Sequence, residues 1–317
     1  MKRKLMVWAV IFFVTLFVAG IVKDQIIKST VTVVTSNVLG APVHIDGFSL
    51  GILTQTVGIS GFKIYNPKGF SNSVLIDLPK IKVKYDVLAL LKKKIHIIEG
   101  QIEIKEMGLE KNKDKKLNVD SLKVVADGQK KSSDKGFPQM PIQIDVLSLN
   151  IGQVVSRDYS VSPGPSLKVY DININKTYKN ISSIQELALL IMSEPMKAAG
   201  IQGATIYGAM MFTGAGFIPV AVASTIFGKN NAKQEYIANL DYAYNVSLEV
   251  LKKMGRVTQE NKAKGLINAE VNGVSVRLEL NKTPNNKTQI IVFAKKMMLP
   301  KPEVASGVIY EISKKLK

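Results

Sequence analysis

The amino-acid sequence predicts an α+β protein that is mainly β, and three observations lead to this class. A charge-free apolar run near the start predicts an N-terminal transmembrane helix. Apolar and polar residues then alternate with a period of two over a long stretch, which predicts a curved antiparallel sheet. The last part combines helical spacing with a hairpin signal, which predicts a small α+β domain. We expect a transmembrane anchor over 1–25, the sheet over 26–190, an apolar helical segment over 191–229 and the small domain over 230–317.

The composition excludes several kinds of site. Among 317 residues there is no Cys, so disulfides, thiolate metal sites and Cys nucleophiles are ruled out. His44 and His96 each lie in a strand-like stretch with no second His or obvious acidic partner nearby, and we interpret both as structural or surface residues. No nucleophile with a base, and no convincing pair of carboxylates, can be assembled. We therefore expect no enzyme activity, no catalytic residue, no metal site and no cofactor.

The net charge of +18 comes mainly from Lys spread along the chain. Such a balance suits an anionic surface, either nucleic acid or acidic lipid head groups. The basic residues interleave with acidic ones and the aromatic residues do not cluster, which disfavours nucleic acid. We therefore expect membrane lipids as partners, and no nucleic acid.

The N-terminus contains the predicted anchor. Lys2, Arg3 and Lys4 precede a run from Leu5 to Val22 that carries no charge. At about 1.5 Å per residue, a run of this length just spans a hydrocarbon core of about 30 Å. The basic residues ahead of it place the N-terminus in the cytoplasm and the remaining chain outside. A cleaved signal peptide is the alternative, but the run is longer than the apolar region of a typical signal.

The next part begins with a helix over 26–38, and strands follow it. The apolar alternation changes parity four times, between Ile59 and Phe62, Ile97 and Ile102, Val146 and Leu147, and Val169 and Ile172. Four changes suggest long strands with bulges, each of which adds a residue and bends the sheet, often at Gly. The alternative is that each change marks the end of a short strand.

An apolar sheet face must be covered by a helix, a second sheet or a ligand. No long amphipathic helix is visible between residues 48 and 181. Either the sheet curls into a closed core, or it forms a trough that holds apolar molecules. The residues that would line a lipid groove are Val57, Ile59, Phe62, Ile64, Ile81, Val83, Tyr85, Val87, Ile95, Ile97, Ile102, Ile104, Ile142, Ile144, Val146, Leu167 and Val169.

The region from residue 1 to about 184 resembles AsmA-like proteins of Gram-negative envelopes. The order and spacing of four segments carry the resemblance: Gly40-x-Pro42-Val43-x-Ile45, Asn66-Pro67-x-Gly69-Phe70, Asp86-Val87-x-Ala89-Leu90-Leu91 and Glu110-x-Asn112-x-Asp114-x-x-x-Asn118. The resemblance implies an inner-membrane-anchored periplasmic protein with a taco-like groove, involved in phospholipid traffic and outer-membrane homeostasis. It brings no catalytic residues. The chain holds only the start of such a groove, which is too short to bridge a periplasm alone.

A second charge-free run extends from Ala198 to Gly228. Its length makes it a membrane candidate, and its small residues at every fourth position allow helices to approach closely. Pro219 interrupts any single helix, so we expect a hairpin or a surface-lying segment that leaves the C-terminus outside. A buried segment of the soluble domain is the alternative.

The last part begins with a helix near 240–254 and continues with strands around an Asn272-Gly273 turn, a further strand near 288–295 and a closing helix over 302–316. This pattern resembles an uncharacterised family of small periplasmic lipoproteins, without their lipidated Cys.

Two functions remain open. The first is lipid handling at the inner membrane, in which the apolar strand faces hold acyl chains. The second is a structural envelope protein or assembly factor whose sheet is a filled core and whose C-terminal domain binds another envelope protein.

Overall fold

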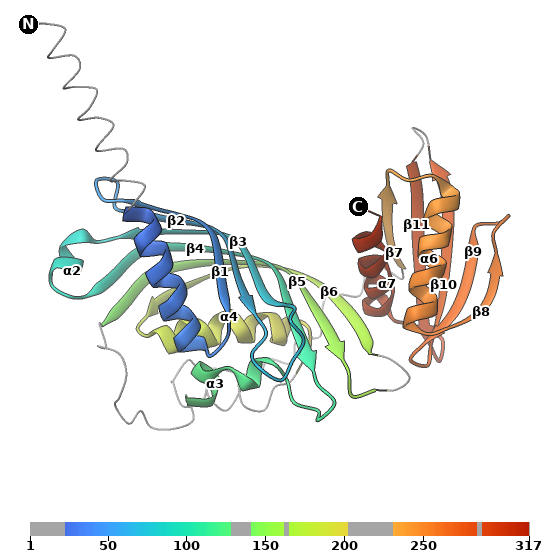
Figure 1. Cartoon of the computed structure of the whole chain (residues 1–317), viewed down its shortest axis with the longest axis horizontal. Helices are drawn as coiled ribbons and strands as arrows, with labels where there is room; N and C mark the ends of the chain where they lie inside the picture. The colour runs from blue at the N-terminus through green and yellow to red at the C-terminus, as the bar shows by residue number, and fades with distance from the viewer. Residues whose placement is uncertain (1–22, 128–140, 162–164, 202–230, 284–286, 317) are drawn as a thin grey trace, which may run out of the picture.

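The computed structural model describes residues 23–127, 141–161, 165–201, 231–283 and 287–316. These residues form two sheets with helices packed against them (Figure 1), so the predicted class, α+β and mainly β, is confirmed. Residues 1–22 of the predicted anchor and 202–229 of the predicted apolar segment lie outside the described residues. Among the helices that the structure describes, none has both the length and the apolar character needed to cross a membrane.

The first sheet, sheet A, has six strands in chain order. The strands are β1 (Val43–Gly51), β2 (Thr56–Tyr65), β3 (Val74–Tyr85), β4 (Ile95–Lys111), β5 (Ile142–Asp158) and β6 (Ser166–Ile181). The sheet bends into an arch (Figure 1). The long β4, β5 and β6 favour the interpretation of bulged long strands over that of short separate ones.

Sheet A is not antiparallel throughout, and on this point the prediction is wrong. Strands β4 and β5 are parallel, with Ile97 beside Ile144 and Ile104 beside Ile151. Residues 112–115 after β4 form a turn, in which Lys115 N–H donates to the Asn112 carbonyl at 3.0 Å. The chain then enters η1 (Val119–Ser121) and α3 (Lys123–Asp127) instead of returning as a strand. Parallel neighbours require such a long crossover, whereas the prediction assumed a hairpin.

Two of the parity changes, in β2 and in β4, coincide with local irregularities of the ladder. Gly61 has φ +59° and separates Ile59 from Phe62, so that both side chains join the same core. In β4 the extra residue is Ile98, two positions before the expected Gly100. In β6, Asn173 and Asn180 have positive φ, a left-handed backbone conformation that Asn tolerates.

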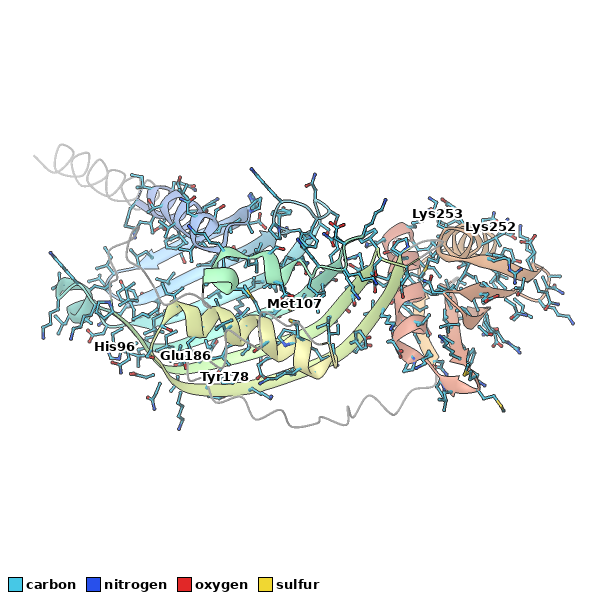
Figure 2. All side chains as sticks on the ribbon, turned by 90° about the horizontal axis from the view of Figure 1, so that it is seen from below. His96, Met107, Tyr178, Glu186, Lys252 and Lys253 are labelled. Carbon is cyan, nitrogen blue, oxygen red and sulfur yellow. The ribbon has the colours of Figure 1, made fainter. Side chains whose placement is uncertain are left out.

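Helices cover the inner side of the arch (Figure 1). They are the N-terminal helix, described over residues 23–39, together with η1, α3 and α4 (Ile184–Ala198). Leu39, Leu122, Leu189 and Met196 from these segments lie in one core with the apolar face of sheet A. Met107 of β4 is fully buried in this core and is labelled in Figure 2.

Helix α4 places the end of the first structural unit later in the chain than expected. The predicted division between residues 190 and 191 falls inside this helix, and its buried residues on both sides of that point belong to the same core. A cap begins the helix: Ser183 Oγ accepts from Glu186 N–H at 3.0 Å, and the Glu186 carboxylate accepts from Ser182 N–H at 2.9 Å. The segment after sheet A therefore belongs to the first structural unit up to about residue 199.

The second sheet, sheet B, has the order β12-β11-β10-β9-β8, with β7 also paired to β11. Its elements are β7 (Asn231–Tyr236), α6 (Leu240–Met254), β8 (Arg256–Asn261), β9 (Leu266–Val271), β10 (Val274–Thr283), β11 (Lys287–Lys296), β12 (Leu299–Pro300) and α7 (Pro302–Lys315). Asn272 and Gly273 have φ of 50° and 73°, the turn expected for their hairpin. Helices α6 and α7 share one core with the sheet.

Helix α7 also packs on β6, so the two sheets are joined through it. Gly307 lies so close to β6 that a Cβ atom there would stand 2.7 Å from the Leu167 carbonyl oxygen. Tyr310 donates its hydroxyl proton to Glu106 at 2.8 Å, and Arg157 donates to the Tyr310 oxygen at 3.3 Å. Burial, with the Glu106 carboxylate close by, raises the pKa of Tyr310 to about 12. Glu106 of β4 thus helps to hold α7 against sheet A.

Candidate functional site

The apolar inner face of sheet A brings together most of the residues expected in a groove. Nine of them belong to the core shared with the covering helices: Ile59, Phe62, Ile64, Ile81, Ile97, Ile102, Ile104, Ile142 and Ile144. Five of these, Phe62, Ile64, Ile102, Ile104 and Ile144, are buried. Around these five buried residues, the covered part of the face, the polypeptide itself fills the space in which a lipid was expected.

The face is less covered at the end of sheet A that carries α2 (Val87–Leu91). Val57 pairs with Val83, and Ile59 pairs with Ile81, across β2 and β3. These four side chains are only half-buried. The same holds for Val87, Ile95, Ile97, Ile142 and Val146. We call Val57, Ile59, Ile81, Val83, Ile95, Ile97 and Ile142 the half-open region.

Two helices contribute half-buried apolar side chains to the core beside the half-open region. The N-terminal helix provides Val31, and α4 provides Leu187 and Ile191. An apolar surface that is concave, half-exposed and flanked by helices is the kind of site that accepts an acyl chain.

Three expected groove residues lie elsewhere. Leu167 and Val169 form a separate cluster with Val155, packed against Tyr310 and Met254 of the second unit. The parity change in β6 therefore reflects burial of two faces by two different partners. Val146 pairs with Glu99, which in turn pairs with Lys84, so Val146 lies on the outer face of sheet A. Tyr85 remains on the inner face beside Ile97, where it is buried and its hydroxyl donates to the Gly51 carbonyl at 3.3 Å.

A charged cluster lies at the junction of α4 and β6, and sequence reasoning missed it. Glu194 is 5 % exposed, and its carboxylate accepts from Lys176 at 2.7 Å and from Lys197 at 3.0 Å. Burial alone raises the pKa of Glu194, but the two ammonium groups outweigh this effect and hold the pKa below its ordinary value. The sequence did contain a signal for this cluster, because Glu194 and Lys197 lie three residues apart in an otherwise apolar helix.

Tyr178 of β6, labelled in Figure 2, lies close enough to this cluster for the Glu194 carboxylate to act on its hydroxyl. Burial, and then the nearby Glu194 carboxylate, raise its pKa strongly, so the hydroxyl stays protonated. Among the described residues, no hydrogen-bond partner lies within reach of the Tyr178 hydroxyl in the geometry shown. Among the residues that the structure describes, the inner face is thus apolar apart from the ion cluster of Glu194, Lys176 and Lys197.

A buried polar network occupies the opposite end of sheet A. Glu110 is 4 % exposed and accepts from Ser71 N–H at 2.8 Å and from Asn66 Nδ2 at 3.2 Å, as well as from the Ser71 hydroxyl. Asn118 donates to Asn66 Oδ1 at 2.7 Å and to the Gly108 carbonyl at 2.8 Å. This network joins the β2–β3 turn to the end of β4 and to η1. It brings together Asn66, Glu110 and Asn118, which belong to two of the four segments noted in the sequence.

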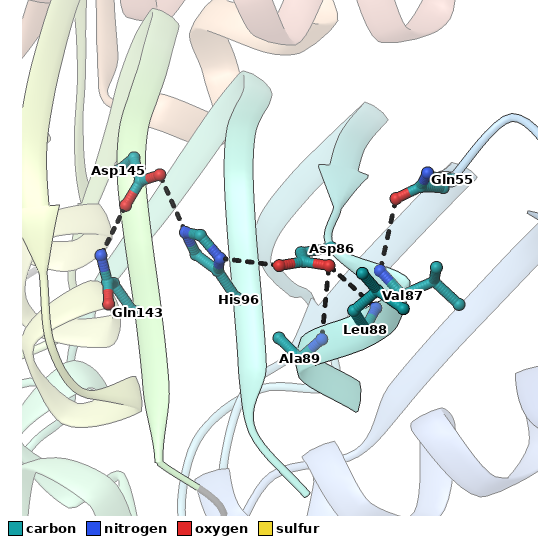
Figure 3. Close-up of polar contacts among 8 residues, drawn as sticks. All are labelled: Gln55, Asp86, Val87, Leu88, Ala89, His96, Gln143 and Asp145. Carbon is teal, nitrogen blue, oxygen red and sulfur yellow. Dashed lines mark hydrogen bonds and ion pairs between the residues drawn. The ribbon is translucent and has the colours of Figure 1, made fainter. Parts of the chain in front are cut away.

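His96 lies between two carboxylates at the α2 end (Figure 3), which corrects the expectation that it has no acidic partner. Its Nε2 is 2.8 Å from Asp145 Oδ2, and its Nδ1 is 3.5 Å from Asp86 Oδ2. Asp86 also caps α2 by accepting from Leu88 and Ala89 N–H. His44, too, has an acidic neighbour, since its Nε2 lies 3.0 Å from Asp46. Parallel pairing of β4 with β5 places Asp145 beside His96, which no sequence spacing indicates.

The pKa values of the cluster follow from these contacts. The hydrogen bond to Asp145 is the largest cause that raises the pKa of His96 above 6.5, with a smaller contribution from Asp86. The pKa of Asp145 is lowered mainly by His96 and then by Gln143. The pKa of Asp86 is lowered mainly by the backbone N–H groups of Ala89 and Leu88.

We expect NMR titration of the His96 imidazole to give a midpoint above 6.5. The stabilising effect of His96 is full below its unfolded pKa and is lost as pH rises through the raised folded value. The stabilising effect of the Asp86 and Asp145 carboxylates is present above their unfolded pKa and is lost as pH falls through their lowered folded pKa values. Asp145→Asn should lower the His96 midpoint more than Asp86→Asn, which keeps a capping side chain. An unchanged midpoint in Asp145→Asn would contradict the assignment.

Within the described residues, no three His, Asp or Glu side chains are grouped in a way that could hold a metal ion. Comparison with models of protein families gives no match for this chain, and comparison with curated proteins gives none either.

Proposed function

We propose that this chain is an AsmA-like, inner-membrane-anchored periplasmic protein that takes part in phospholipid handling and outer-membrane homeostasis. The half-open region is the observation that carries the proposal. Its apolar side chains are half-exposed, they lie on the concave side of sheet A, and two helices flank them. The sequence resemblance and the charge-free run from Leu5 to Val22 support the location. The proposed partners are membrane lipids and other envelope proteins, and the proposed role is not enzymatic.

The extent of the covered part limits this proposal. Helix α4 and the segment containing α3 bury the middle of the inner face, where Ile104 and Leu149 have 1 % and 0 % exposure. The proposed protein therefore holds acyl chains only at the α2 end and does not provide a continuous apolar channel along the arch. The limited length of this acyl-chain site agrees with the sequence-based expectation that the chain is too short to carry lipid between membranes alone.

Lipid mass spectrometry on the full chain, purified in mild detergent, tests the proposal. We expect phospholipid in stoichiometric amount, and we expect Val83→Asp to lower it about tenfold or more, because a carboxylate in contact with an acyl chain is strongly disfavoured. Lys82→Asp is the matched control, since Lys82 is the exposed neighbour on the opposite face of the same strand. Equal lipid in both variants, with unchanged circular dichroism, would contradict lipid binding in the half-open region.

The second candidate function is a structural envelope or assembly factor, and one observation favours it. The helix-free face of sheet B holds a hollow of about 430 Å³, lined by polar, charged and aromatic side chains that include Asn268, Arg277, Glu279 and Phe293. A partner protein could bind there while the core of sheet A serves only as a scaffold. A lipid-free, monodisperse full chain would favour this second function.

A further inference from the structure

The β1–β2 turn and α2 lie at the same end of sheet A (Figure 1), and both carry exposed apolar side chains. Ile52 and Leu53 in the β1–β2 turn are 54 % and 98 % exposed, and Leu88 and Leu91 of α2 are 63 % and 78 % exposed. Single exposed apolar residues are ordinary on protein surfaces, but four on two adjacent loops form a patch. We call residues 52–53 and 87–94 the apolar tip.

The two loops are held together by hydrogen bonds. Tyr85 N–H donates to the Gln55 carbonyl at 2.9 Å, and Val87 N–H donates to Gln55 Oε1 at 3.3 Å. The Asp86 carboxylate caps α2 and lies beside His96. The exposure of the tip is therefore a feature of an ordered part of the fold.

Positive charge adjoins the apolar side chains. Lys92, Lys93 and Lys94 follow α2 directly and are exposed. Among the described residues, no carboxylate lies within ion-pair distance of these three ammonium groups. Apolar side chains flanked by several Lys suit the boundary between acyl chains and anionic head groups.

The position of the N-terminal helix indicates which surface meets the tip. Lys23 Nζ donates to the Leu50 carbonyl, and Asp24 Oδ1 accepts from Leu50 N–H at 3.2 Å, so the helix begins beside the β1–β2 turn. The charge-free run that ends at Val22 immediately precedes it. If this run spans a membrane, the surface of that membrane lies next to Ile52 and Leu53.

We propose that the apolar tip inserts into the head-group region of the anionic bilayer that carries the N-terminal run. This inference rests on the membrane-anchoring part of the proposed function and is independent of acyl-chain binding in the half-open region. Docking at both the anchor and the tip fixes the orientation of the arch on the membrane. It also places the half-open region, which shares this end of sheet A, close to the lipids.

The absence of Cys makes the test direct, because single labels can be introduced into the full chain. NBD is attached at Leu53→Cys or Leu91→Cys, and the protein is reconstituted into phosphatidylglycerol-containing vesicles with nitroxide-labelled acyl chains. We expect a blue shift and strong quenching at both tip positions. A label at Ala263→Cys, exposed in the β8–β9 turn, serves as the control and should show neither effect.

A label at Phe12→Cys separates the two proposals. If Phe12 is quenched while Leu53 and Leu91 are not, tip docking is wrong and the anchor remains. If Phe12 is not quenched either, the anchoring and the docking both fail. Retained or lost phospholipid in the Val83→Asp experiment bears only on the half-open region.

Charge reversal tests the lipid class. Changing Lys92, Lys93 and Lys94 to Glu should lower the docked-to-undocked ratio in anionic vesicles by roughly fivefold per Lys. The matched control changes three exposed Lys of the second unit, Lys264, Lys282 and Lys296, to Glu. Equal tip quenching in the two triple variants would overturn the anionic-lipid assignment.

Discussion

Ile104→Asp is expected to unfold sheet A, lowering its free energy of unfolding by about 5 kcal/mol. Ile104 is 1 % exposed in the covered part of the inner face, between β3 and β5 and beneath the helices. A carboxylate placed there loses its water without gaining a partner. Hydrogen exchange read by mass spectrometry should show lost protection across β2 to β6. Sheet B has a core of its own, so β9 to β11 should remain protected.

Val83→Asp is the matched variant for this experiment. Val83 lies on the same apolar face but in the half-open region, where its new carboxylate can reach water. We expect a loss of about 1 kcal/mol and protection close to that of the unchanged chain. Should Ile104→Asp be tolerated as well as Val83→Asp, the inner face would be open along its whole length.

Residue periodicity predicts the strands of sheet A well because successive side chains in a strand point to opposite faces. Two of the parity changes come from a local irregularity, the positive φ of Gly61 in β2 and the extra residue Ile98 in β4, whereas the change in β6 comes from burial of its two faces by different partners. The parallel pairing of β4 with β5 could not be predicted in this way, since alternation is the same in either direction. Only the path of the crossover decides the direction, and no pattern in residues 112–141 reveals it.

The candidate site could be predicted only in part for a related reason. Alternation identifies which side chains are apolar and share a face, but it does not say what covers them. The covering helix α4 was missed because Pro195 and Glu194 interrupt its apolar run, although the Ser183 cap was a readable signal. His96 meets Asp145 only through strand pairing, across 49 residues of chain.

Glu110→Ala is expected to lower the free energy of unfolding of sheet A by about 3 kcal/mol. The carboxylate accepts hydrogen bonds from Asn66 Nδ2 and from both the backbone and the hydroxyl of Ser71. Its removal leaves Ser71 N–H without its acceptor and takes a charged acceptor from Asn66 and from the Ser71 hydroxyl, in a region where Asn66 is buried. Urea denaturation of the full chain, followed by far-ultraviolet circular dichroism, measures the loss.

Two further variants identify the cause of this loss. Glu103→Ala changes the same residue type at an exposed position of β4 and should alter stability by less than about 0.5 kcal/mol. Glu110→Gln keeps the size of the side chain but turns an amide N–H₂ toward donors, so it should restore only part of the stability. Because the network joins the β2–β3 turn to β4 and η1, hydrogen exchange should rise first in Ser71, Ser73 and Val119. Full stability in Glu110→Ala would mean that water replaces the carboxylate at no cost, and the network would then not be what holds this end of the arch together.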